Sequence, residues 1–146
     1  MTKSMRRIIV AGAATLFVST ALAGDDPQHE RHELMEDVRD AAKVLGSMLK
    51  GETEFDNAAA MESLKVWKPC AAQVVRLFPE GSEGGEAAPA NWSDRAGFDA
   101  ALAAWADATD AAIAANPGTL EEGKPVIGAA FGKCKDCHDT YRIEDE

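Results

Sequence analysis

The residues best suited to chemistry in this sequence are two cysteines and a histidine in the segment Cys134-Lys135-Asp136-Cys137-His138. This C-x-x-C-H pattern is the attachment sequence for a c-type haem. In such a site each thiol adds to a haem vinyl group as a thioether, and the histidine becomes an axial ligand of the iron. Residues three and four positions apart share one face of a helix, so these three side chains can address one flat macrocycle. The pattern predicts one covalently attached haem c.

Two other kinds of site contain a C-x-x-C pair, namely a thioredoxin-type redox motif and half of a zinc site. The redox motif belongs in a βαβ setting, for which this sequence has no strand pattern. A zinc site needs a fourth ligand, and His138 directly follows Cys137, where it is poorly placed to chelate with it. A haem-free helical interaction protein would need both cysteines free or joined in a disulfide. No catalytic triad, carboxylate pair or phosphate loop stands out, so we expect no enzyme.

The N-terminus has the three parts of a secretory signal peptide. Three basic residues, Lys3, Arg6 and Arg7, precede an apolar run at 8–18 and the small-residue pattern Ala21-Leu22-Ala23. The run is shorter than the roughly 20 residues of a membrane-spanning helix, and no later stretch is longer. We expect a signal peptide at 1–23, one domain at 24–146, a periplasmic location and no membrane insertion.

The charge of the chain narrows the class of partner. Its 146 residues include 25 acidic and 15 basic side chains, a net charge of −10, and removing residues 1–23 leaves −13. Binding to nucleic acid needs clustered Lys and Arg, so we expect no nucleic-acid partner. Attraction between opposite charges instead favours redox partner proteins with basic surfaces.

Apolar residues recur at steps of three and four along the mature chain, which is typical of amphipathic helices. The first stripe comprises Met35, Val38, Ala42, Leu45 and Leu49. It predicts a helix over 27–50, with an acidic cap at position 25 or 26, Pro27 in the first turn and Gly51 as a left-handed stop. A second helix is predicted over 55–78, with a kink at Pro69.

The stretch 79–91 has three glycines, two prolines and no apolar period, so it is predicted to be the one long loop. A third helix is expected from a cap at Ser93 to the stop Asn116-Pro117-Gly118. Thr119 and Glu122 form a capping box for a fourth helix that carries the C-x-x-C-H segment. Four helices with two short connections predict an all-α, antiparallel four-helix bundle.

The order of these parts resembles the class II c-type cytochromes, the cytochrome c′ family. The likeness rests on the motif near the C-terminus in Cys137-His138-Asp139-Thr140-Tyr141-Arg142, on Leu49-Lys50-Gly51-Glu52 before Phe55-Asp56, on Leu77-Phe78-Pro79 and on Trp92. It extends over essentially the whole mature chain. The resemblance implies a monohaem protein that transfers single electrons or binds a diatomic gas such as nitric oxide or carbon monoxide.

Members of this family divide by the residue that the first helix places over the iron. Counting back from Lys50-Gly51, Met35 stands at that position. A ligating methionine would make the iron six-coordinate and low-spin, as in one branch of the family, and an apolar residue would leave it five-coordinate. Because Met35 also belongs to the apolar stripe, a role in the core is the competing interpretation.

Other residues near the expected site have weaker assignments. Arg31, one turn before Met35, is predicted to contact a haem propionate, and Arg142, one turn after His138, to shield that ligand. His32 is expected at the surface, and Cys70 as a buried thiol, with an intermolecular disulfide as the alternative. The sequence leaves open whether the protein is a monomer or a homodimer.

Overall fold

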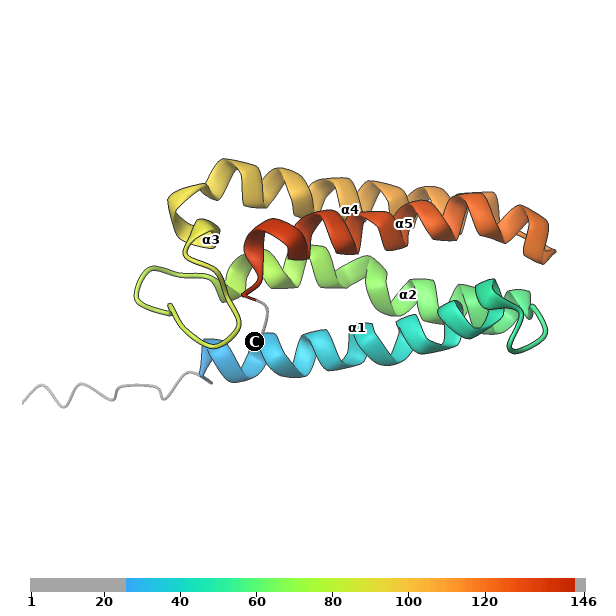
Figure 1. Ribbon diagram of the computed structural model, residues 1–146, viewed down its shortest axis with the longest axis horizontal. Coiled ribbons are helices and arrows are strands. Elements are labelled where there is room, and N and C mark those ends of the chain that lie inside the picture. Colours follow the sequence, from blue (N-terminus) through green and yellow to red (C-terminus); the bar gives the residue numbers. More distant parts are fainter. Residues whose placement is uncertain (1–25, 144–146) are drawn as a thin grey trace, which may run out of the picture.

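The computed structural model describes residues 26–143, and the predicted signal peptide at 1–23 lies outside them. Four long helices lie side by side in alternating directions (Figure 1): α1 (Pro27–Lys50), α2 (Asn57–Val74), α4 (Arg95–Ala115) and α5 (Leu120–Tyr141). A single 3₁₀ turn, η1 (Val75–Leu77), prolongs α2, and the short helix α3 (Ala90–Ser93) precedes α4. The predicted antiparallel four-helix bundle is confirmed. Over residues 26–143, no helix is both long and apolar enough to cross a membrane.

The ends of α1 follow from its sequence. The side chain of Asp26 accepts a hydrogen bond from the Gln28 amide at 3.0 Å, and Gly51 ends the helix with a φ of 74°. The bounds agree with the prediction because both a cap and a left-handed stop are present. At α5, Thr119 caps as expected, but the Glu122 carboxylate accepts from the amide of Gly118, one residue before the capping-box position.

Two helices differ from the prediction at their ends. The helix predicted over 55–78 begins after Asp56, whose side chain accepts from the amide of Ala59, and its α-helical part ends at Val74. Phe78 leaves helical geometry, at φ −121° and ψ 53°, because Pro79 disfavours a helical residue before it. The chain runs on as a helix through Pro69, and the ribbon of α2 changes direction along its length (Figure 1).

The cap of α4 is Asp94 rather than the predicted Ser93. The Ser93 hydroxyl donates back to the Pro89 carbonyl and closes α3, whereas the Asp94 carboxylate accepts from the amide of Gly97. Both residue types cap helices well, so the choice between neighbours depends on this extra turn of helix.

The core consists of two apolar clusters. In the first, Trp67 is 1% exposed, donates its indole N–H to the Val38 carbonyl at 3.0 Å and meets Phe131 edge-on at 5.0 Å. In the second, the Phe98 ring lies 4.8 Å from Phe78 and 5.3 Å from Tyr141. Each cluster draws residues from all four long helices, so together they hold the bundle along its length.

Candidate cofactor-binding site

A cavity of about 550 Å³ lies between the long helices, in the ~300–1,000 Å³ range typical of cofactor sites. Side chains from all four long helices and from the loop after η1 line it. The lining includes six residues singled out from the sequence: Arg31, Met35, Cys134, Cys137, His138 and Arg142. Residues more than 100 positions apart in the chain thus meet at one site.

The three residues of the C-x-x-C-H motif reach this cavity from the last two turns of α5. Cys134 packs against the first apolar cluster and Cys137 against the second, so the motif spans both. Burial, with the nearby Cys137, raises the pKa of the Cys134 thiol to about 11, and burial also raises the pKa of Cys137. Reactive cysteines of redox motifs have lowered pKa values, so these neutral thiols do not fit that chemistry.

His138 lines the cavity near the end of α5, where part of its side chain is open to solvent. Partial burial of its ring is the largest cause that lowers its pKa, and the positive charge of Arg142 acts in the same direction. Glu86 and Asp139 oppose these effects. A neutral imidazole keeps a nitrogen lone pair for a metal ion.

Met35 enters the cavity from α1. It is half-buried and packs against the second cluster, the same cluster that Cys137 contacts. His32, one turn earlier, also lines the cavity, but it is exposed and its Nε2 lies 3.6 Å from the Glu36 carboxylate. The surface position predicted for His32 agrees with the structure.

Arg31 makes contacts that sequence reasoning missed. The guanidinium is buried and donates to the backbone carbonyls of Leu77 (2.8 Å), Ser82 (2.9 Å) and Gly84 (3.4 Å). A fourth bond reaches the Ser82 hydroxyl. Both terminal nitrogens are therefore engaged by the loop of residues 79–89, hereafter the strap. The predicted contact between Arg31 and a propionate stays a prediction.

Arg142 also holds the strap, from the other side of the cavity. Its Nε donates to the Glu86 carboxylate at 2.7 Å, and both side chains are half-exposed. The backbone bridge between Ala87 and Arg142 continues this contact. The predicted position of Arg142 beside His138 is consistent with its effect on the pKa of the histidine.

The lining of the cavity fits a haem. The rings of Trp67, Trp105 and Phe98 line it and form an aromatic wall, which suits a planar macrocycle. Trp105 is 4% exposed, and its indole N–H has no hydrogen-bond partner among residues 26–143. Buried donors are almost always paired, so a polar group of a bound molecule or a water would complete this site.

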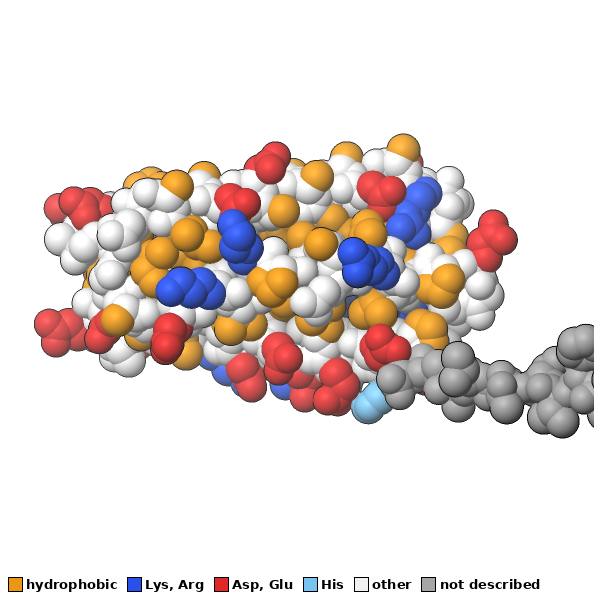
Figure 2. Space-filling model, turned by 180° about the vertical axis from the view of Figure 1, so that it is seen from behind, with side chains coloured by type: hydrophobic (Ala, Val, Ile, Leu, Met, Phe, Trp, Pro, Cys, Tyr) orange, Lys and Arg blue, Asp and Glu red, His pale blue; other side chains and the backbone are white. Residues whose placement is uncertain are grey.

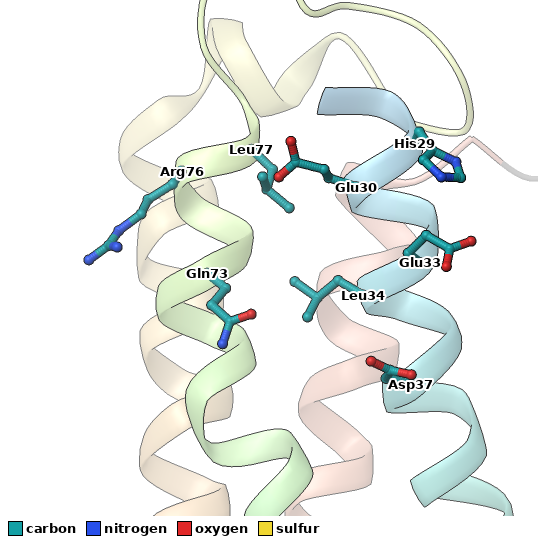
Figure 3. A pocket seen from close by; sticks show the side chains of 8 residues that line it. All are labelled: His29, Glu30, Glu33, Leu34, Asp37, Gln73, Arg76 and Leu77. Carbon is teal, nitrogen blue, oxygen red and sulfur yellow. The ribbon is translucent and has the colours of Figure 1, made fainter. Parts of the chain in front are cut away.

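A second hollow, of about 630 Å³, lies on the outer side of α1 and α2 (Figure 3). Leu34 and Leu77 point into the gap between the helices, whereas Arg76 points away from it. Its α1 wall carries Glu30, Glu33 and Asp37, and no cysteine lines it. This hollow has neither the thiols that covalent haem attachment requires nor the aromatic wall of the first cavity.

Known proteins resemble this chain in sequence and in fold. Residues 26–142 match the family described as Cytochrome C′. The cytochrome c′ of Rhodopseudomonas palustris is 35% identical over 146 residues, which cover 96% of this chain and 97% of the relative. A solved structure of R. palustris cytochrome c′ has a TM-score of 0.79 at 33% identity, over 84% of this chain and 100% of that one.

Two further relatives differ in name. Cytochrome c-556 of R. palustris is 33% identical over 150 residues, which cover 97% of this chain and 99% of the relative. A nitric oxide complex of a mutant cytochrome c′ from Alcaligenes xylosoxidans has a TM-score of 0.68 at 30% identity, over 82% of this chain and 98% of that one. Because the family match covers the whole bundle and the cavity with its C-x-x-C-H motif, this chain belongs to the cytochrome c′ family.

Proposed function

We propose that this protein is a periplasmic, non-enzymatic carrier of single electrons whose haem iron is ligated by His138 and Met35. Proteins of the cytochrome c′ family carry a covalently attached c-type haem with its iron, so the cofactor follows from membership. The observation that carries the finer proposal is that Met35 on α1 lines the same cavity as the motif on α5.

Each residue has a defined part in this proposal. Cys134 and Cys137 would hold the haem through thioether sulfurs, and His138 would ligate the iron through an imidazole nitrogen. Met35 would ligate the iron through a soft thioether sulfur. The haem, when bound, supplies a couple in which the iron gains or loses one electron. The aromatic and aliphatic lining keeps water from its faces.

With two ligands supplied by the protein, the iron would keep its coordination on electron transfer, and an external ligand would have to displace Met35. The position of Met35, which in one branch of the family that the sequence resembles holds a ligating methionine, supports a role as a carrier. Periplasmic location is supported by the signal-peptide pattern in residues 1–23, which lie outside the described part of the chain.

Binding of nitric oxide or carbon monoxide at a five-coordinate iron is the second candidate. The family relative solved with nitric oxide supports it. In this alternative Met35 packs over the iron without bonding to it, as its half-buried position in the second cluster also allows. The two candidates differ in the spin state of the iron.

The deciding experiment compares absorption spectra of the haem-loaded wild type and Met35→Ala, oxidised, reduced and treated with carbon monoxide. We expect a low-spin wild type with an iron–sulfur charge-transfer band and slow or weak carbon monoxide binding. Met35→Ala should become high-spin and bind the gas readily. A wild type that is already high-spin, with no change of spin state on substitution, would contradict Met35 ligation and favour the gas-binding candidate.

Covalent attachment is tested separately. The mature protein should weigh one haem more than its polypeptide and keep its colour through acid–acetone extraction. The double variant Cys134→Ser, Cys137→Ser should lose its colour to the solvent. Colour that stays with the double variant would contradict the assignment of the two thiols.

A further inference from the structure

The strap, residues 79–89, connects two helices that meet only sparsely in the bundle. α1 packs mainly on α2, and α5 mainly on α4, whereas direct contact between α1 and α5 is limited. Gly84, Gly85, Glu86 and Ala87 of the strap line the cavity that lies between these helices. Figure 1 shows this loop reaching the start of α1 and passing beside the end of α5. The strap therefore closes one end of the cavity.

On the α1 side, Arg31 holds the strap through several carbonyl groups at once. Its NH1 nitrogen binds the Leu77 carbonyl before the strap, and its NH2 nitrogen binds the carbonyls of Ser82 and Gly84 within it. Gln28 adds a bond from its side-chain amide to the Glu83 carbonyl at 2.9 Å. These bonds bring together residues that are about fifty positions apart in sequence.

The Arg31 side chain has little freedom to move. It is 8% exposed, and its guanidinium carbon lies 4.6 Å from the centre of the Phe78 ring and 5.8 Å from that of Trp92. A planar guanidinium suits this stacked position with its fork of donors, which an ammonium group does not reproduce. The position thus selects arginine over lysine.

On the α5 side, backbone bonds fasten the strap to the end of the helix that carries the motif. The amide of Ile143 donates to the Glu86 carbonyl at 2.8 Å, and the amide of Ala88 donates to the Tyr141 carbonyl at 3.1 Å. The ion pair between Arg142 and Glu86 lies beside them. One loop is thus bonded both to the helix of Met35 and to the helix of His138.

We propose that Arg31 is a positioning residue, which holds the strap against α1 and so fixes the spacing between Met35 and His138 across the cavity. Arg31 lies one turn before Met35, so a strap fixed at Arg31 and at Arg142 sets how far α1 can move from α5. A loosened strap opens the end of the cavity and lets external ligands compete with Met35. The role of Met35 as a ligand rests on the proposed function, whereas the bonds by which Arg31 holds the strap do not depend on it.

The test uses the haem-loaded mature protein with Arg31→Gln and Arg31→Lys. Lys43→Gln is the matched control, because it removes one exposed positive charge from α1 away from the cavity. Hydrogen exchange at the backbone amides of residues 80–88, measured by mass spectrometry, reports the hold on the strap. In Arg31→Gln these amides should exchange at least ~10-fold faster, and Arg31→Lys should not restore the wild-type rate. Lys43→Gln should stay within about twofold of wild type.

The second readout is the association rate of carbon monoxide with the reduced protein, with the low-spin fraction recorded alongside. Arg31→Gln should bind the gas several-fold faster and show a smaller low-spin fraction. Glu86→Gln, which weakens the exposed ion pair on the α5 side, should shift both strap exchange and gas binding by about two- to threefold in the same direction. This milder variant keeps the test valid if Arg31→Gln does not fold.

The failure of each proposal has its own signature. If the Arg31 and Glu86 variants match Lys43→Gln in both strap exchange and gas association, the positioning role is overturned, whatever the spin state of the wild type. A high-spin wild type that Met35→Ala leaves unchanged would overturn Met35 ligation alone. In that case the exchange rates and gas association rates of the Arg31 variants still decide whether the strap closes the cavity.

Discussion

Burial decides what the cysteines outside and inside the motif can do. Cys70, on α2, is 3% exposed and directs its Sγ at the Val66 carbonyl, 2.9 Å away. Burial, with the negative charge of Asp37, raises the pKa of its thiol to about 11. The predicted buried thiol agrees with this geometry, and a buried neutral thiol is poorly placed for an intermolecular disulfide.

At the residue scale, the Cys70 thiol predicts a dependence of stability on pH. Its folded pKa lies above the unfolded value of about 8.5. The unfolded chain therefore releases this proton first, and the stabilisation is lost as pH rises from about 8.5 to about 11. Denaturant unfolding should show a steeper loss of stability over this range in wild type than in Cys70→Ala, by up to ~1.4 kcal/mol per pH unit.

The same residue provides a simple control. Iodoacetamide at pH 8 should leave Cys70 unmodified in the native haem-loaded protein and label it after unfolding. If the free energies of unfolding of wild type and Cys70→Ala run parallel with pH, or if the native protein is labelled rapidly, the thiol is not held neutral by burial.

At the scale of the element, α4 and α5 meet at a point where only glycine fits. A Cβ atom at Gly97 would overlap the Asp94 carboxylate and the Tyr141 hydroxyl. These two groups are hydrogen-bonded to each other at 2.9 Å, and the Asp94 carboxylate also caps α4. The close approach thus joins the start of α4 to the end of the helix that carries the motif.

Gly97→Ala should therefore destabilise the protein by about 1–3 kcal/mol, because the added methyl displaces a cap and a packed ring. Gly132→Ala is the matched control, since a Cβ there meets no atom within 4 Å. Alanine is the better helix former, so this change should stabilise the protein by about 0.5–1 kcal/mol. Chemical denaturation measures both, and equal effects of the two substitutions would refute the steric argument.

The bounds of helices could be predicted where the signal is local. Asp26, Pro27 and Gly51 mark both ends of α1 within a few positions, and the prediction agrees there. At α4 two adjacent residues, Ser93 and Asp94, can both cap a helix, so the local sequence does not determine which of them caps α4. The added turn of α3 uses Ser93 and leaves Asp94 as the cap. Local chemistry predicts an end only when a single candidate is present.

Several residues that line the cavity could be named from the sequence, but their connections could not. The motif singled out Cys134, Cys137 and His138, the resemblance to the family singled out Met35, and all four line one cavity. The bonds from Arg31 to the strap were missed because its partners are irregular backbone 46 to 53 positions away. Backbone carbonyls are present in every residue, so no side-chain pattern indicates which of them an arginine will bind.

At the scale of the whole molecule, charge determines encounters. The full chain carries a net charge of −10, and residues 24–146 alone carry −13. On the face seen in Figure 2, acidic side chains gather along the edge formed by α1, while Lys and Arg side chains lie singly above them. Several of the basic side chains are paired with carboxylates, as in Lys68–Asp110 and Arg95–Asp99. This pairing leaves the acidic excess to act at long range.

Electron exchange with a basic redox protein should therefore slow as salt is added. The screening length falls from about 30 Å at ~0.01 M to about 8 Å at ~0.15 M, so long-range attraction is lost over that interval. Stopped-flow rates with a lysine-rich cytochrome should fall several-fold, and rates with an acidic partner should rise. Rates that are independent of salt with both partners would point to an apolar contact or to local charges of the opposite sign.

The aromatic wall of the cavity also gives the protein an internal optical signal. Two of its three tryptophans, Trp67 and Trp105, line the cavity, and their rings lie 6.0 Å apart. Indole emission overlaps haem absorption, so a haem in the cavity quenches the fluorescence of both. Any event that separates α2 and α4 from the haem, including global unfolding, makes the molecule brighter. Trp92, whose ring meets Phe78 at a tilted angle near Arg31, extends this signal to the end of the cavity that the strap closes.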